Sequence, residues 1–260
     1  MVDRQFSEAG LAELYNAFHP WGKRGDFDFY LPLIMAAESV LDVGCGTGAL
    51  LRGAREAGHR GRLCGLDPAG AMLEVARRRS DVEWVSGDLA SVAWDREFEL
   101  VVMTGHAFQV LLSDDDVRGS LLAVRSALTD DGRFAFETRN PLVREWEQWT
   151  PEHAIEITLD AEDAEDAEDA EDAEAGRVVI RMADQVEAVE GDIVRFSTTF
   201  TSSRWDRPQT SHSTLRFLGT GPLSSFLSGA GLAIEEQFGD WAGNPLTATS
   251  REIITLARRG

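Results

Sequence analysis

The feature that most constrains the fold is a regular alternation of apolar strands and helices between Ser39 and about Glu137. Strands are predicted by five short apolar runs, at 39–43, 62–66, 82–86, 98–104 and 132–137. Helices are predicted between them, at 49–58, 69–79 and 114–128. Because strands separated by helices form a parallel sheet that is covered on both faces, the sequence predicts an α/β fold.

After Pro141 the pattern changes to alternation with a period of two residues, which is typical of half-buried antiparallel strands. Such strands are predicted at 154–159, 177–189, 192–203 and 213–218, with a hairpin turn at 190–192. A helix at 221–231 and two strands at 233–241 and 251–259 follow. We therefore expect a main domain at 39–141 and 219–260, interrupted after its fifth strand by an antiparallel β insertion at 142–218.

The charge of the chain is strongly negative, with 45 acidic residues, 25 basic residues and a formal net charge of −20. Ten of the acids lie in an alanine-rich repeat at 160–176, which we predict to be a solvated loop at a hairpin tip. Binding of a cation or a basic partner is the alternative for this repeat. The overall charge disfavours nucleic acid and anionic membranes as partners.

The composition narrows the class of protein further. Two cysteines, Cys45 and Cys64, are too few for a disulfide framework or a multi-thiolate zinc site, so we expect no bound metal. No apolar run approaches the ~18 residues that cross a bilayer, and the N-terminus lacks the order of a signal peptide. We expect a cytoplasmic protein with no membrane partner. Whether it forms a homodimer is left open by the sequence.

A glycine-rich turn marks the expected binding site. In VLDVGCGTG (40–48), Gly44, Gly46 and Gly48 lie where the first strand turns into the first helix, and ligands bind at such turns in open parallel sheets. The GxGxG spacing differs from the GxGxxG of dinucleotide-binding folds. Asp67 ends the second strand, where a carboxylate can accept both hydroxyls of a ribose, and Asp88 follows the third strand, where it can meet an adenine.

The motifs DVGCGTG, LDPA and SGDLA in this order resemble those of the class I S-adenosylmethionine-dependent methyltransferases, and the whole resembles the small-molecule members. The resemblance covers about 36–140 and the two C-terminal strands. It implies a Rossmann-like, seven-stranded, mostly parallel sheet whose last strand is antiparallel, with S-adenosyl-L-methionine as cofactor. It also implies that residues 1–38 form a helical lid and that 142–218 cap the acceptor.

The resemblance also implies roles for single residues. Asp42 would hold the cofactor amino group, and Asp67 the ribose. The remaining cofactor contacts would be Gly44, Cys45, Gly46, Pro68, Met72, Asp88, Leu89, Thr104 and Gly105, with Tyr15 and Trp21 from the lid. The alternatives are that Asp67 and Asp88 cap helices, that Cys45 is a packed small side chain, and that the lid is an amphipathic helix packed on the sheet.

Candidates for the chemistry lie at the ends of the fourth and fifth strands. His106 is the leading general base, because an imidazole titrates near ~6.5; contact with the cofactor or packing under a loop is the alternative. The acceptor is expected to meet Glu137, Arg139, Asn140 and Trp241. A salt bridge and a turn, or ordinary packing for Trp241, would explain these residues equally well.

The sequence thus predicts a methyltransferase that acts on oxygen, nitrogen or carbon of a small molecule. A base is needed only where the acceptor must lose a proton. The rivals are a cofactor-binding module without catalysis and, less favoured, a nucleotide-cofactor oxidoreductase. Methylation of a protein stays open.

Overall fold

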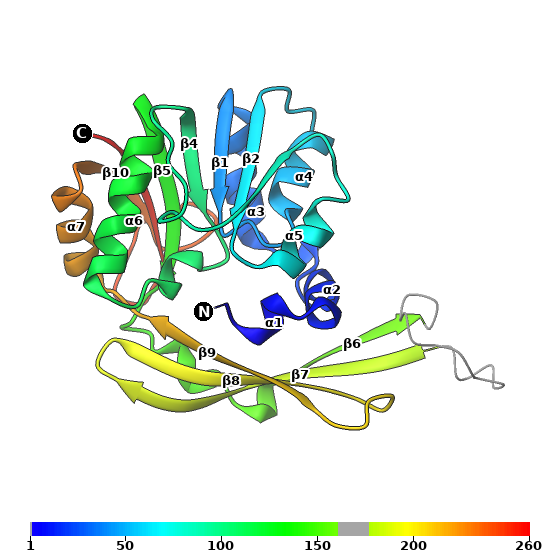
Figure 1. Cartoon of the computed structure of the whole chain (residues 1–260). Coiled ribbons are helices and arrows are strands. Elements are labelled where there is room, and N and C mark those ends of the chain that lie inside the picture. Colours follow the sequence, from blue (N-terminus) through cyan, green and yellow to red (C-terminus); the bar gives the residue numbers. More distant parts are fainter. Residues whose placement is uncertain (1, 161–176) are drawn as a thin grey trace.

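The computed structural model describes residues 2–160 and 177–260. Its main sheet has seven strands in the order β3-β2-β1-β4-β5-β11-β10 (Figure 1). The strands are β1 (Ser39–Val43), β2 (Arg62–Asp67), β3 (Glu83–Ser86), β4 (Phe98–Met103), β5 (Leu128–Arg139), β10 (Leu232–Phe238) and β11 (Glu252–Arg259). β11 pairs antiparallel with both β5 and β10, and all the other pairs in this sheet are parallel. The predicted fold class is confirmed, including the antiparallel last strand.

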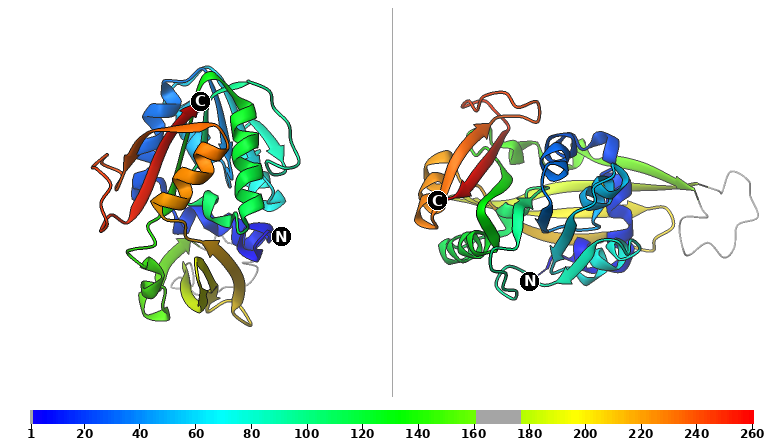
Figure 2. Two further views of the ribbon diagram at one scale, coloured as in Figure 1. Left: turned by 90° about the vertical axis from the view of Figure 1, so that its left-hand side faces the viewer. Right: turned by 90° about the horizontal axis from the view of Figure 1, so that it is seen from above.

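Helices cover both faces of this sheet, as Figure 2 shows. One face is covered by α3 (Gly25–Met35) and α4 (Ala49–Glu56), and the other by α6 (Asp114–Ala127) and α7 (Thr220–Gly229); α5 (Gly70–Ala76) follows β2. Because side chains alternate along a strand, Val40 packs with the first pair of helices and Leu41 with the second. The core therefore has two layers, one on each side of the strands.

The insertion forms a separate four-stranded antiparallel sheet in the order β6-β7-β8-β9. Its strands are β6 (Ile155–Asp160), β7 (Arg177–Glu190), β8 (Ile193–Ser202) and β9 (Gln209–Arg216), and the short helices η3 (Glu145–Gln148) and η4 (Pro151–His153) precede them. It lies across the end of the main sheet to which the parallel strands point (Figure 1). Of the predicted loop at 160–176, Asp160 is the last residue of β6, and 161–176 fall outside the described residues.

The N-terminal segment lies between the two sheets (Figure 1). It forms α1 (Arg4–Ser7), α2 (Ala9–Phe18) and η1 (Trp21–Lys23) before α3 begins. Leu11, Leu14 and Phe18 of α2 are buried against apolar residues of β7 and β8. The segment is thus part of the packing that joins the insertion to the main domain.

Two strand boundaries differ from the prediction for identifiable reasons. β5 begins at Leu128 and not at 132, because α6 passes into it without a loop and the register shifts between Phe98 and Leu100 of β4. β9 begins at Gln209 and not at 213, because its polar first half pairs fully with β8. Among the described residues, no helix is both long and apolar enough to cross a bilayer.

Candidate functional site

The glycine turn after β1 has the backbone that its sequence predicts. Gly44, Gly46 and Gly48 have φ of 75°, 55° and 70°, a region that side chains other than glycine rarely adopt. A Cβ at Gly48 would lie 2.2 Å from Cη2 of Trp84, whereas a Cβ at Gly46 would have no atom within 4 Å. The turn is therefore tightly packed at Gly48 and open at Gly46.

Asp67 is fixed to this turn by hydrogen bonds. The Gly46 N–H donates to Oδ2 at 2.8 Å, and the Ala69 N–H donates to Oδ1 at 2.7 Å. Burial raises the pKa of Asp67, and the two backbone donors oppose this rise. Since each carboxylate oxygen can accept a further bond, Asp67 keeps capacity for hydroxyl donors. It does not cap α5, whose N-cap residue is Ala69.

Asp88 lies in a tight turn after β3. Its Oδ1 accepts the N–H groups of Ala90 and Ser91 at 3.1 and 2.9 Å, and the residue is exposed. Leu89 beside it is buried in the core cluster under α6. No helix follows Asp88, so it does not cap one as the alternative supposed; its carboxylate closes a turn, and a contact with adenine stays a proposal.

Asp42 is the most unusual acid of the site. It is 1% exposed, and its Oδ1 has no hydrogen-bond partner within the described parts of the chain. Burial raises the pKa of Asp42 to about 7, and the nearby Asp67 carboxylate adds to the rise. A buried carboxylate without a donor costs free energy, so this oxygen is suited to a cationic or N–H donor from a ligand.

Cys45 follows the first glycine of the turn and packs against Leu73, Ala76 and Trp84. Burial raises the pKa of its thiol well above the usual range. A protonated thiol is a poor nucleophile. The packing alternative accounts for this side chain, and only its backbone is available to a ligand at the turn.

The N-terminal segment contacts the turn through α2. Asn16 Oδ1 accepts the hydroxyl of Thr47 at 2.6 Å. Tyr15 packs in an apolar cluster with Met72 and Ala69, next to the exposed Pro68. These residues come together beside the Asp67 carboxylate, as the resemblance implies.

Trp21 lies elsewhere. Its ring packs on Phe27, with centroids 4.7 Å apart, and covers Gly53 of α4, where a Cβ would lie 2.1 Å from Cη2. This position supports the packing alternative for Trp21 over a contact with the cofactor.

Arg24 enters the site from the start of α3. Its Nη2 pairs with Asp26 Oδ2 at 2.5 Å, and both side chains are largely buried. Nη2 also lies 3.4 Å from the position that a Cβ at Gly105 would take. The charge of Arg24 acts on Asp42, and Nη1 makes no hydrogen bond among the described residues. A guanidinium is therefore available near the Asp42 carboxylate.

His106 follows β4 in the short loop that contains Thr104 and Gly105. A Cβ at Gly44 would lie 2.8 Å from Cβ of Ala107, so this loop packs against the glycine turn. His106 Nε2 lies 2.9 Å from Oε2 of Glu252, the first residue of β11. Burial lowers the pKa of His106 to about 3, and the Arg139 charge adds to this. The imidazole is neutral at neutral pH.

Glu137 is completely buried and holds the loop of His106. Its Oε1 accepts the His106 backbone N–H at 2.7 Å, and its Oε2 accepts the Tyr30 hydroxyl at 2.5 Å. Burial raises the pKa of Glu137. Because both oxygens are engaged, the geometry favours a positioning role for Glu137 over the expected contact with an acceptor.

Arg139 and Asn140 differ in how far their side-chain hydrogen-bonding groups are engaged by the protein. Arg139 Nη1 donates to Gln109 Oε1 at 3.0 Å, and its Cζ lies 5.3 Å from the ring centroid of Trp149. Asn140 donates to the Ser250 carbonyl at 2.8 Å, and its own oxygen accepts the Leu142 N–H. Asn140 therefore fastens the loop before β11, and Arg139 is the better candidate to meet an acceptor.

Trp241 packs on the face of the main sheet that α3 and α4 cover, next to Phe29 and Tyr30 of α3. A cavity of about 450 Å³ lies instead between the 144–152 segment and β7, and Trp149 lines it. Trp149 thus borders both this cavity and Arg139. Trp146 and Trp149 line this cavity, and Trp241 does not.

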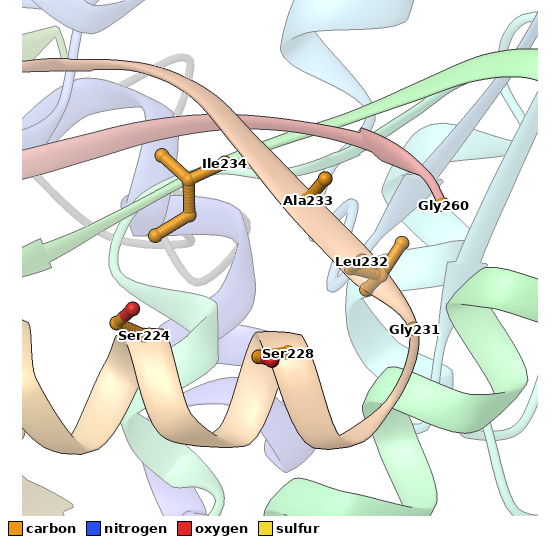
Figure 3. A pocket seen from close by; sticks show the side chains of 7 residues that line it. All are labelled: Ser224, Ser228, Gly231, Leu232, Ala233, Ile234 and Gly260. Carbon is orange, nitrogen blue, oxygen red and sulfur yellow. The ribbon is translucent and has the colours of Figure 1, made fainter.

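A further hollow of about 260 Å³ lies between α7 and β10 (Figure 3). It is lined by Ser224, Ser228, Gly231, Leu232, Ala233, Ile234 and Gly260. Three strands separate β10 from β1 in the sheet, and the hollow has no acidic or basic side chain. Within the described ranges, no group of three or more His, Cys, Asp or Glu side chains could hold a metal ion.

Comparison with known proteins finds similarity to methyltransferases. A family model described as a methyltransferase domain matches residues 40–132, less than half of the chain, and this stretch contains the glycine turn, Asp67, Asp88 and His106. The fold is that of solved S-adenosylmethionine-dependent methyltransferases, such as a protein of Clostridium acetobutylicum with a TM-score of 0.71 and 16% identity over 96% of this chain. The CalS10 methyltransferase of Micromonospora echinaspora, with a TM-score of 0.64 and 21% identity, was solved with S-adenosylmethionine bound.

Parts of this chain are also similar in sequence to curated methyltransferases. The 2-phytyl-1,4-naphtoquinone methyltransferase of Thermosynechococcus vestitus is 32% identical over 43% of this chain, a match that spans only about half of that relative (52%). The cypemycin N-terminal methyltransferase of a Streptomyces species is 25% identical over 85% of this chain and 83% of its own length.

Among solved structures, the CcbJ methyltransferase of Streptomyces caelestis aligns over 98% of both chains, with a TM-score of 0.73 and 18% identity. At this identity the likeness concerns the fold, and it includes the insertion because nearly all of both chains align.

The residues of the site fit S-adenosyl-L-methionine. The amino acid part of this cofactor carries an ammonium and a carboxylate group, and the site offers the Arg24 guanidinium and an Asp42 oxygen that has no hydrogen-bond partner among the described residues. The open side of Gly46 and the remaining lone pairs of Asp67 suit the ribose. The site thus has a partner of suitable charge for each polar part.

Sequence reasoning missed two charged residues of the site, Arg24 and Glu252. Arg24 lies in an aromatic-rich N-terminal segment whose path was not predicted, and Glu252 lies 146 residues from His106 in the chain. Neither belongs to a local motif. The position of Glu252 at the start of the last predicted strand was the one available signal.

Proposed function

We propose that the protein transfers a methyl group from S-adenosyl-L-methionine to a small-molecule acceptor. The observation that carries this proposal is the buried Asp42 oxygen, which has no partner in the described part of the chain and lies beside a glycine turn that is tied to a second carboxylate. When bound, the cofactor supplies an activated methyl group on sulfur, so the protein has mainly to align the acceptor and exclude water.

Each part of the cofactor has a proposed partner. Asp42 holds the amino group, Arg24 the carboxylate and Asp67 the ribose hydroxyls. The adenine lies between Tyr15 and Met72 on one side and the turn of Asp88 and Leu89 on the other. The backbone of Gly44, Cys45 and Gly46, with Thr104 and Gly105, lines the remaining wall.

The acceptor would lie between the main sheet and the insertion, which we propose as its cap. His106 is the proposed base, because its ring is neutral and only partly buried. Arg139 of the main sheet lies over the ring of Trp149 of the insertion, and the cavity next to Trp149 would take the part of the acceptor that does not react.

We favour nitrogen as the methylated atom. The relative that aligns over most of this chain is named for methylation at an N-terminus, and an amine acceptor must lose a proton before or during transfer, which a neutral imidazole can take. Oxygen and carbon acceptors remain consistent with the same site.

Calorimetric titration tests this proposal against its rivals. S-adenosylhomocysteine should bind at one site per chain, and NAD and NADP should not bind. Binding of either nucleotide without binding of S-adenosylhomocysteine would show that the site serves an oxidoreductase. Binding of S-adenosylhomocysteine with no methyl transfer to any amine, alcohol or thiol offered would support the module without catalysis.

A further inference from the structure

Two partly buried side chains meet at the end of the main sheet from distant parts of the chain. His106 follows β4, and Glu252 begins β11. Nε2 of the imidazole lies 2.9 Å from Oε2 of the carboxyl group, and the side chains are 18% and 11% exposed. A hydrogen bond that is largely removed from water fixes the direction of the ring more strongly than an exposed one.

The backbone of His106 is fixed separately. Its φ of 63° lies in the left-handed region, which is uncommon for residues other than glycine. The backbone N–H is held by Glu137, whose other oxygen accepts the hydroxyl of Tyr30. A residue held in such a conformation by its surroundings is typical of functional sites. With the backbone fixed, Glu252 is the residue that hydrogen-bonds to the ring.

The bond at Nε2 determines what Nδ1 can do. No residue in the described ranges makes a hydrogen bond to Nδ1, and the ring is partly exposed. An ionised Glu252 can only accept, so Nε2 must then carry the hydrogen and Nδ1 keeps a free lone pair. A protonated Glu252 can donate to Nε2, and the ring hydrogen then lies on Nδ1, which can no longer accept a proton.

We propose that Glu252 is a positioning residue that selects the tautomer of His106, so that the base is available only while Glu252 is ionised. This rests on the proposed function, with His106 as base. In the competent state, the bond between the acceptor atom and its hydrogen breaks and an Nδ1–H bond forms. The imidazolium that results is stabilised by the Glu252 carboxylate, in the manner of the carboxylate–histidine pairs of other enzymes.

The charges around the pair set the pH at which this change occurs. Arg139 of β5 is the direct cross-strand neighbour of Glu252, and Arg251 precedes it in the chain. Both guanidinium groups favour the ionised carboxyl group, and Asp26 of α3 opposes it. The carboxyl groups that act on the His106 ring are Glu137, Glu145 and Asp26.

Burial outweighs these charges at Glu252 and raises its pKa to about 7. Below this pH Glu252 carries a proton and Nδ1 is blocked, and above it the base is free. Burial lowers the pKa of His106 to about 3, so the ring is uncharged near neutral pH in the free protein. The imidazolium forms only transiently, as the acceptor gives up its proton next to the ionised Glu252.

The chain contains a matched control pair on its surface. His212 Nδ1 lies 2.9 Å from Oε1 of Glu187, between β9 and β7, with side chains 70% and 40% exposed. The distance equals that of the buried pair, but water competes for both partners. Loss of Glu187 should therefore affect only His212.

The test is long-range proton–nitrogen NMR of the histidine rings in the full chain, with the His106 signals assigned by His106→Asn. At pH 8 we expect Nε2 to be protonated and Nδ1 to be bare, and we expect the hydrogen to move to Nδ1 as the pH falls through about 7. In Glu252→Gln this transition should disappear, Glu252→Asp should restore it at a shifted pH, and Glu187→Gln should leave it unchanged.

Two results would overturn the proposal. The first is a protonated Nδ1 at pH 8 in the unsubstituted protein, which needs no variant to fold. The second is a His106 titration in Glu252→Gln identical to that of the unsubstituted protein. Calorimetry with S-adenosylhomocysteine on the unsubstituted protein tests the proposed function independently, because the NMR measurement requires neither cofactor nor acceptor.

Discussion

At the scale of single residues, the site depends on two carboxyl groups that differ in their hydrogen bonds to the protein. Asp67 accepts two backbone N–H groups and holds the glycine turn in place. Asp42, on the neighbouring strand, has one oxygen without any donor in the described chain. The first is already stabilised by the protein, and the second is completed only by a ligand. Their contributions to binding should therefore differ in pH dependence.

Asp42 should couple cofactor binding to release of a proton. Without ligand, burial raises the pKa of Asp42 to about 7, so at pH 6 the group is largely protonated. An ammonium partner favours the carboxylate, and up to about one proton should leave on binding. Calorimetry with S-adenosylhomocysteine in buffers of different ionisation enthalpy measures this. Affinity should rise between pH 5.5 and 7.5, and Asp42→Asn should abolish both effects. Equal proton release by the variant would remove Asp42 from the site.

Arg24 should act on the carboxylate of the cofactor alone. Arg24→Gln should weaken S-adenosylhomocysteine roughly tenfold, because one charge-assisted bond is lost. Methylthioadenosine, which lacks the amino acid part, should bind equally to both proteins. Asp26→Asn is the matched control, since it breaks the same ion pair but keeps the guanidinium. An equal loss for both ligands would indicate a general structural effect and contradict this role.

At the scale of elements, α2 joins the parts of the molecule. Its apolar side packs on β7 and β8, and Asn16 on the same helix bonds to the glycine turn. A single helix therefore touches both the proposed cofactor site and the proposed cap. Its contribution to the free energy of unfolding should be large, because undocking this helix would expose its apolar side chains to water.

Phe18→Ala tests this packing. The side chain is 6% exposed and its ring lies 5.7 Å from that of Phe200. The substitution should lower the free energy of unfolding by about 3 kcal/mol or more, as for other buried phenylalanines. Leu122→Ala on α6, which is 54% exposed, is the control and should change it by less than about 0.5 kcal/mol. Denaturant unfolding measures both. A small effect of Phe18→Ala would show that α2 is only loosely docked.

The elements were largely predictable from sequence because their signals are local. The period of the apolar residues located the strands of both sheets, and the glycine turn located the end of β1. The polar first half of β9 was missed, because only pairing with β8 reveals it. At the site, Asp42 and Asp67 follow from motif position, whereas Arg24 and Glu252 reach it through tertiary packing that no motif records.

At the scale of the whole molecule, the acidic repeat should be dispensable for the fold. Asp160 and Arg177, which flank the segment 161–176, are direct partners in the hairpin of β6 and β7. A two-residue Asn-Gly turn can close such a hairpin. This replacement removes nine acidic residues and should preserve the affinity for S-adenosylhomocysteine, with equal or higher stability because a shorter loop costs less entropy. Calorimetry and thermal unfolding measure this, and lost affinity would assign the segment a role in the site.

The central claim is that Asp67 and the glycine turn together bind the adenosyl group. Its most direct test is calorimetric titration of S-adenosylhomocysteine into the unsubstituted protein and Asp67→Ala, with the exposed Asp130→Ala as control. We expect one site per chain, an unchanged affinity for Asp130→Ala, and a loss of about 2 kcal/mol or more for Asp67→Ala, roughly thirtyfold. No binding to the unsubstituted protein, or equal affinity for Asp67→Ala, would contradict the claim.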